Sequence, residues 1–235
     1  LLAYYPLDSP DGGSDVSGNG NHATVNGATF GPDRLGMEGK AYRLDGDDYI
    51  QTPVDSNSLP ISFSVWFKPE KITGELSIID SDRGGSYGHS LIIGYFNRDG
   101  DYHVQYHDGH IDTGIQAVQD KWLHATVTFG EKIQLYLDGV LVTEEVYNKR
   151  AINGVNFRIG RHNTGDPQWF TGLVDEVRFY ERILSAEEAF DLYQLEGSSL
   201  QKSSSFTLVP GTGDTDNSAF TIDGDSLKLA APLDF

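Results

Sequence analysis

The sequence predicts an all-β protein built from many short strands that are joined by tight turns. Apolar and polar residues alternate in several short segments, which is the period of a strand with one buried face. The chain of 235 residues also contains 27 glycines, many of them in dipeptides that favour turns. Only the segment after Ser185 has the pattern of a helix.

The clearest strands lie in the middle of the chain. Residues 61–68 and 122–129 alternate, so that every second side chain is apolar. Residues 133–137 and 140–142 flank Asp138-Gly139, a dipeptide that favours the tight turn of a β-hairpin. A similar strand pair is predicted around Asp45-Gly46, from residues 41–46 and 49–52. Further strands are predicted at residues 2–7, 77–80, 90–95, 102–106, 157–160 and 173–180.

The predicted helix begins after Ser185. Glu188 comes three residues after Ser185, which is the spacing of a capping box in which each side chain accepts the other residue's free backbone N–H. Ala189, Leu192 and Tyr193 then fall on one helical face. We expect two or three turns that end near Gly197.

The composition changes after this helix. Residues 197–205 are rich in serine and resemble a linker, and the remaining residues are too few to bury a core of their own. We therefore expect a sandwich domain over residues 1–197 and a linker with a partial segment over residues 198–235. The abrupt ends suggest a piece of a larger multidomain chain.

The charge balance is strongly acidic. The chain has 17 Lys and Arg against 35 Asp and Glu, a formal net charge of −18. Nucleic acids and anionic membranes need clustered basic residues, so both are poor partners. The absence of cysteine excludes disulfides and thiolate metal sites. No run of about 20 apolar residues is present, so membrane insertion is not expected.

Several motifs occur in a characteristic order. They are residues 4–8, 15–21, 41–46, 63–69, 122–124, 135–139, 172–180 and 184–188. In this order they resemble the laminin G-like, concanavalin A-like lectin/glucanase superfamily, over roughly residues 1–195. The resemblance implies a jelly-roll sandwich of two antiparallel sheets with one short C-terminal helix. Residues 206–209, 213–217 and 233–235 resemble the opening of a bacterial cadherin-like repeat, a module of surface adhesins.

The resemblance implies a structural calcium ion that ties an early loop to a late strand. By this analogy its ligands are Asp15, Asn21, Asp175 and the carbonyl of Gly46. Calcium prefers six to eight hard oxygen ligands, which an acidic loop such as residues 15–21 can supply.

An interpretation without calcium is also open for these residues. Asp15 and Asn21 are common turn residues, and Asp175 could pair with Arg178 or Arg43.

A second calcium site is implied at the rim of the sandwich. In laminin G domains and pentraxins, a ligand-binding calcium lies between two loops. The similar segments here supply Asp80 and Asp82 from one loop, and Asn163 and Asp166 from the other. The alternative is a pair of solvated acidic loops.

Sugar binding requires aromatic faces and polar side chains side by side. An aromatic ring stacks on the apolar face of a pyranose, while polar groups bind its hydroxyls. The loop residues of suitable type are Arg83, Tyr87, His89, His107 and Trp169. Each of these residue types is also common in loops without a function.

No catalytic arrangement is evident. Glycosidases of this sandwich type carry a Glu-x-Asp-x-x-Glu run, which is absent here. Residues 84–88 match Gly-x-Ser-x-Gly, but a strand is predicted after them where a nucleophile elbow needs a helix. We therefore expect that the protein is not an enzyme, and a polysaccharide lyase that uses Tyr and His is the enzymatic alternative.

These expectations favour a calcium-dependent, carbohydrate-binding, lectin-like module. Its setting would be a bacterial surface adhesin or a secreted polysaccharide-binding protein, outside the cell. Two alternatives stay open, a structural or protein-binding spacer and an accessory domain of a glycoside hydrolase or polysaccharide lyase.

Overall fold

The computed structural model describes two separate units, Leu1–Gly197 and Ser198–Phe235. Residues 9, 11, 83–87, 95–100, 107–110, 148–152, 163–167, 198–219, 224–225 and 230–235 lie outside the described residues. In the second unit the structure describes one antiparallel strand pair, β16 (Phe220–Asp223) and β17 (Ser226–Leu229). The resemblance of this unit to a cadherin-like repeat stays a prediction.

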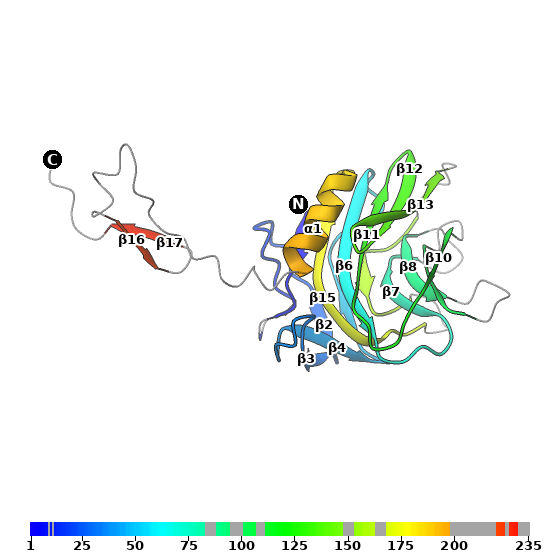
Figure 1. The fold of residues 1–235 in the computed structure, drawn as a ribbon, viewed down its shortest axis with the longest axis horizontal. Coiled ribbons are helices and arrows are strands. Elements are labelled where there is room, and N and C mark those ends of the chain that lie inside the picture. The colour runs from blue at the N-terminus through cyan, green and yellow to red at the C-terminus, as the bar shows by residue number, and fades with distance from the viewer. Residues whose placement is uncertain are drawn as a thin grey trace. The chain divides into compact units, whose positions relative to one another are not determined.

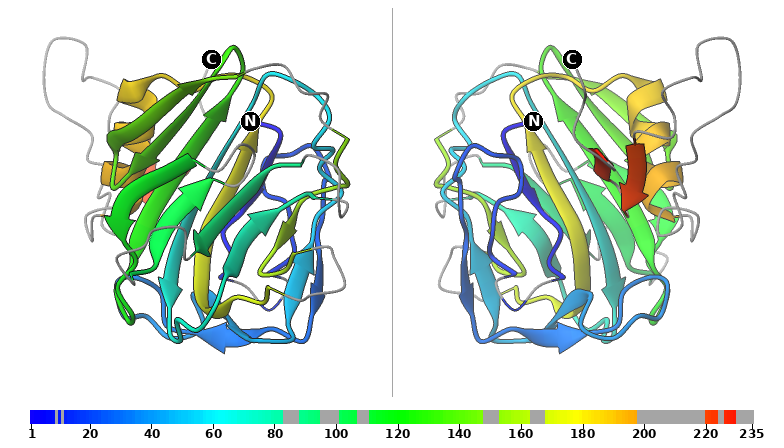
Figure 2. Two further views of the ribbon diagram at one scale, coloured as in Figure 1. Left: turned by 90° about the vertical axis from the view of Figure 1, so that its right-hand side faces the viewer. Right: turned by 90° about the vertical axis from the view of Figure 1, so that its left-hand side faces the viewer.

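The first unit consists of two antiparallel sheets, which confirms the predicted sandwich (Figures 1 and 2). The eight-stranded sheet has the order β13 (Val140–Val146), β12 (Lys132–Leu137), β11 (Leu123–Phe129), β6 (Ile61–Pro69), β15 (Thr171–Tyr180), β4 (Ala41–Asp45) and β3 (Thr29–Gly31). Its remaining strand, β1 (Ala3–Tyr5), also pairs with β15. The seven-stranded sheet has the order β10 (Ile111–Gln116), β9 (His103–Tyr106), β8 (Ser90–Gly94), β7 (Leu76–Asp80), β14 (Arg158–Ile159), β5 (Tyr49–Gln51) and β2 (Thr24–Asn26).

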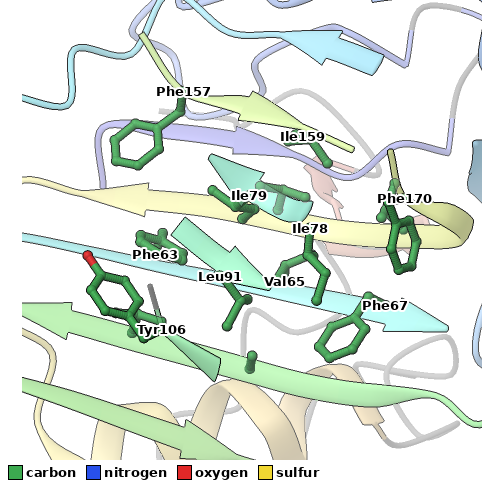
Figure 3. Packing of buried hydrophobic residues seen from close by; sticks show 14 of the residues in the cluster. Phe63, Val65, Phe67, Ile78, Ile79, Leu91, Tyr106, Phe157, Ile159 and Phe170 are labelled. Carbon is green, nitrogen blue, oxygen red and sulfur yellow. The ribbon is translucent and has the colours of Figure 1, made fainter. Parts of the chain in front are cut away.

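The core lies between the inner faces of the two sheets (Figure 3). Phe63, Val65 and Phe67 of β6 point into it, as the alternation of this segment predicts. From the other sheet, Leu91 and Tyr106 meet them, and both are fully buried. Period-two alternation in strands from both sheets therefore generates one continuous apolar layer.

The segment around Asp45-Gly46 differs from the prediction. The sequence predicts a hairpin here, but β4 pairs with β3 and β15 whereas β5 pairs with β2 and β14. The two strands belong to different sheets, so the turn carries the chain from one layer to the other. The Asp-Gly hairpin is confirmed at Asp138-Gly139, where both residues have positive φ and β12 pairs with β13.

Helix α1 (Ala186–Gly197) packs against the outer face of the eight-stranded sheet (Figure 1). The predicted capping box is present: Ser185 N donates to Glu188 Oε2 at 2.8 Å, and Glu188 N donates to Ser185 Oγ at 3.1 Å. Tyr193 stacks on Trp66 of β6 with ring centroids 5.7 Å apart. Within the described residues, no helix has the length and apolar character needed to cross a membrane.

Candidate functional site

The outer face of the seven-stranded sheet carries a row of three side chains, two of which are polar; we call it the polar row. Ser77 of β7, Ile92 of β8 and Gln105 of β9 are aligned in register. Their chain neighbours belong to the core, so these three side chains point to the outer face. Ser77 Oγ and Gln105 Nε2 are buried and have no hydrogen-bond partner in the part of the chain that the structure describes. A buried polar group without a partner costs about 1–3 kcal/mol, which makes both groups candidates for ligand contacts.

A charged cluster adjoins this row. Asp80 lies opposite Arg158 and Ser90 in the neighbouring strands, and Ser90 Oγ donates to Asp80 Oδ2. The Arg158 guanidinium lies 3.9 Å from Asp80 and the His162 ring lies 3.8 Å from it. Burial raises the pKa of Asp80 to about 6, although these cations and the serine act against the shift. A hydrogen bond with Asp82 raises the pKa of His162.

Two aromatic rings and an arginine lie at the β5 side of the cluster. Arg161 and Trp169 form a β-bridge next to β14, which places both near Tyr49 of β5. The Arg161 guanidinium carbon lies 4.9 Å from the Tyr49 centroid and 4.8 Å from the Trp169 centroid. The two rings are 6.2 Å apart and all three side chains are partly exposed. This aromatic pair and the polar row together supply the side chains that sugar binding needs.

The structure places the predicted rim residues in two different groups. Asp80 and Asp82 lie in the charged cluster, and Trp169 lies in the aromatic pair. Both carboxylates face an imidazole or a guanidinium, which suits an ion-paired network better than a calcium site. Five predicted residues lie outside the described residues: Arg83, Tyr87, His107, Asn163 and Asp166.

His89 lies in the core and not on the rim. Its ring is fully buried, bonds Tyr106 Oη at 2.5 Å and the Ser56 carbonyl at 3.1 Å, and stacks on Phe157. Burial lowers the pKa of His89 to about 4, so the ring is neutral at pH 7. This position does not fit the predicted contact with a sugar.

At the predicted structural calcium site, the Asp15 carboxylate is hydrogen-bonded to backbone groups of the protein itself. The Asp15 carboxylate accepts backbone N–H groups from Tyr4 at 3.0 Å, Ser17 at 2.8 Å and Asn21 at 2.9 Å. Burial acts to raise the pKa of Asp15, but these donors outweigh it and hold the pKa below its usual value. The Asn21 amide donates to the Leu2 carbonyl at 2.8 Å. The loop is thus held by hydrogen bonds of the kind that the interpretation without calcium predicts.

Asp175 is paired with an arginine that the sequence did not single out. Its carboxylate meets Arg34 Nη1 at 2.5 Å, and both side chains are buried. Burial raises the pKa of Asp175 well above its usual value, and the Glu176 carboxylate adds to the shift. The buried carboxylate of Asp175 therefore has a cationic partner within the chain, and calcium ligation by Asp175 stays a prediction.

The described residues contain one group of carboxylates that could hold a metal ion. Asp45, Asp47 and Asp48 each offer an oxygen within 4.8 Å of the others, in the turn that surrounds Gly46. A hydrogen bond with Asp45 and its charge raise the pKa of Asp47; burial raises that of Asp48, and the neighbouring carboxylates add to it. The sequence pattern pointed to Gly46 and not to these neighbours, although the acidic run Asp45-Gly46-Asp47-Asp48 was the available signal.

One solved structure resembles this chain in both fold and sequence. It is domain 4 of AbnA, a GH43 extracellular arabinanase from Geobacillus stearothermophilus, in complex with arabinotriose. The identity is 27%, the match covers 83% of this chain and 98% of that domain, and the TM-score is 0.68.

Two toxin binding domains share the fold at lower identity. The botulinum neurotoxin serotype D binding domain is 19% identical with a TM-score of 0.60, and that of Paraclostridial Mosquitocidal Protein 1 is 17% identical with a TM-score of 0.61. Each match covers 82% of this chain, which spans about half the length of either binding domain.

The family comparison agrees with the architecture. A search of curated proteins found no match. A family model described as the concanavalin A-like lectin/glucanases superfamily matches residues 44–190, which include most strands of both sheets and the start of helix α1. The chain therefore belongs to the concanavalin A-like lectin/glucanases superfamily.

Proposed function

We propose that this protein is a carbohydrate-binding, lectin-like module, and that the outer face of its seven-stranded sheet holds the sugar. The observation that carries the proposal is the pair of buried, unpartnered groups on that face, Ser77 Oγ and Gln105 Nε2, which have no hydrogen-bond partner among the described residues. Both can bond sugar hydroxyls, since a serine hydroxyl donates or accepts and an amide nitrogen donates. Such bonds would remove the cost of leaving the two groups without partners.

The aromatic pair supplies the second element of a sugar site. Tyr49 and Trp169 are partly exposed beside the charged cluster, so a ring face can meet the apolar face of a pyranose. The seven-stranded sheet and the bridge beside it thus combine stacking with hydrogen bonding, the usual make-up of a small-molecule site.

The similarity to domain 4 of the arabinanase supports the ligand class. That domain was solved with arabinotriose, and the match covers nearly its whole length. We propose by analogy that this chain also acts outside the cell, in a secreted polysaccharide-binding protein or a surface adhesin, and that it binds its ligand without cleaving it.

Calcium dependence is a further part of the proposal. The turn of Asp45, Asp47 and Asp48 gathers three carboxylates whose mutual repulsion a divalent cation would relieve. This turn leads directly into Tyr49, so an ion there would stiffen the segment that carries one ring of the aromatic pair. A structural or protein-binding spacer is the competing hypothesis.

Sugar binding is tested by calorimetric titration with a panel of oligosaccharides that includes arabinotriose. We expect binding by the unmodified chain and a loss of roughly tenfold or more in Trp169→Ala, because a stacking face is removed. Trp122→Ala is the matched control, since Trp122 contacts Lys68 of the eight-stranded sheet. If no member of the panel binds, the spacer hypothesis replaces the proposal.

The same titrations in calcium and in chelator test the metal. Calcium bound to the folded state should raise the melting temperature and strengthen sugar binding, and Asp47→Asn should weaken both effects. Equal melting and equal affinity in calcium and chelator would remove calcium from the proposal.

A further inference from the structure

Arginines of this acidic protein are paired with carboxylates, with one exception among the described residues. The paired ones are Arg34 with Asp175, Arg43 with Glu70, Arg158 with Asp80, Arg178 with Glu176 and Glu196, and Arg182 with Glu188. Arg161 has no carboxylate partner in the described part of the chain. With 35 acidic residues available in the sequence, an arginine without one is unexpected.

The surroundings of Arg161 hold its side chain in place without satisfying it. The guanidinium carbon lies over the rings of Tyr49 and Trp169, at 4.9 and 4.8 Å from their centroids. Its N–H bonds lie in the plane of the group and point along its edges. Nε is buried and has no hydrogen-bond partner among the described residues. The guanidinium is therefore flanked by two aromatic rings, and its charge has no carboxylate partner within the described residues.

We propose that Arg161 binds a carboxylate of the ligand, so that the module prefers acidic glycans built from uronic acids. This inference rests on the proposed carbohydrate site and names its substrate class. A guanidinium matches a carboxylate with two parallel N–H···O bonds, a geometry that neutral sugar hydroxyls do not reproduce. The carboxylate of an acidic ligand would pair with Arg161, which has no carboxylate partner among the described residues.

The charges nearby decide how the preference would arise. Burial lowers the pKa of Arg158 and the charge of Arg161 adds to this shift, while the carboxylates of Asp80 and Asp82 act against it. The net charge of −18 gives no long-range attraction for an anion. The preference must therefore come from direct contact at Arg161, with the aromatic pair holding the sugar ring beside it.

The test compares trigalacturonate with galactotriose, which differ in the carboxylate at each ring. We expect the unmodified protein to bind the acidic trimer at least tenfold more tightly. In Arg161→Gln this advantage should disappear while galactotriose affinity changes by less than roughly threefold. Arg161→Lys should recover only part of it, because an ammonium lacks the planar fork. Arg182→Gln, which removes an equal charge at the start of helix α1, should leave the preference intact.

The salt dependence is a second measurement that needs no variant. Between low and high sodium chloride, binding of trigalacturonate should weaken while binding of galactotriose stays level. Equal affinity for both trimers, or an acidic preference that survives in folded Arg161→Gln, would overturn the inference but leave the carbohydrate module standing. Failure of the unmodified protein to bind either trimer, or any sugar of the panel, would overturn both.

Discussion

The polar residues on the outer faces of the two sheets differ in how they are paired. On the eight-stranded sheet, polar groups lie beneath helix α1 and the charged ones pair with one another: Arg178 with Glu196, and Arg34 with Asp175. Trp66 Nε1 donates to Glu196 Oε2 at 2.8 Å, which ties the last turn of the helix to the sheet. These contacts come entirely from within the chain, so this face is structural.

On the seven-stranded sheet, the charged cluster is paired but the neighbouring groups are not. Arg161 has no carboxylate, and Ser77 Oγ and Gln105 Nε2 have no hydrogen-bond partner within the described residues. The eight-stranded sheet also has such groups, on Ser64, Thr126 and His124, but there Tyr193 of helix α1 packs against the rings of His124 and Trp66. The two faces therefore differ in one respect: only on the seven-stranded sheet, within the described residues, does a charged group without a carboxylate partner lie beside partly exposed aromatic rings. That combination suits a ligand.

The largest effect is expected where the structural face is broken. Glu196→Ala leaves the buried Arg178 without this partner and Trp66 without its acceptor. Removal of one member of a buried ion pair costs about 3–5 kcal/mol of unfolding free energy. Chemical denaturation followed by tryptophan fluorescence would measure the loss.

Glu187→Gln is the control for this variant, since Glu187 is exposed in the first turn of the same helix. It should change the unfolding free energy by less than about 1 kcal/mol. An equally small change in Glu196→Ala would show that the pairs beneath the helix are not what holds it.

A smaller effect is expected from the pH dependence of the structural face. Burial lowers the pKa of His124 from 6.5 to about 3, and Arg178 and Arg34 add to the shift. A lowered folded-state pKa stabilises the protein above pH 6.5, and this contribution is lost as the pH falls toward 3, because the unfolded chain gains the proton first. Between pH 7 and pH 5 the loss is roughly 2 kcal/mol.

The variant His124→Phe isolates this contribution. Phenylalanine keeps a flat ring against Trp66 and Tyr193 and brings no titrating group. The difference in unfolding free energy between pH 7 and pH 5 should be smaller in the variant by that amount, with other groups common to both proteins. Identical pH profiles would mean that the pKa of His124 is the same in the folded and the unfolded chain.

The strands were predictable because their signals are local. Alternation in residues 61–67 predicts the buried face of β6, and Asp138-Gly139 predicts the hairpin of β12 and β13. The helix start was predictable for the same reason, since Ser185 and Glu188 are three residues apart. The predicted hairpin at Asp45-Gly46 was wrong because β4 and β5 belong to different sheets: β4 pairs with β3 and β15, and β5 pairs with β2 and β14. Two of these partners, β15 and β14, are more than a hundred residues away.

The candidate site depends on such distant pairings. Tyr49 meets Arg161 only because β14 pairs with β5, and no local pattern specifies that register. The same holds for Arg34 and Asp175, which are 141 residues apart. Residue type was enough to identify Trp169 and Asp80 as candidates. The residues that surround them in space could be identified only from the fold.

The smallest effect on stability separates the two faces most sharply. Ser77→Ala and Gln105→Leu remove buried polar groups that have no partner among the described residues, so each should leave stability unchanged or raise it by less than about 1 kcal/mol. If the outer face of the seven-stranded sheet binds sugar, each variant should nevertheless lose roughly three- to tenfold in affinity. Thermal melts and calorimetric titrations of the same samples would measure both quantities.

Ser64→Ala is the matched substitution on the other face. Ser64 Oγ is also buried and has no hydrogen-bond partner among the described residues, but it lies on β6 of the helix-covered sheet. Its stability should respond as that of Ser77→Ala does, while sugar affinity should stay the same. If Ser77→Ala and Ser64→Ala bind sugar equally well, the unpartnered groups of the seven-stranded sheet are packing features, and the ligand contacts lie elsewhere on the domain.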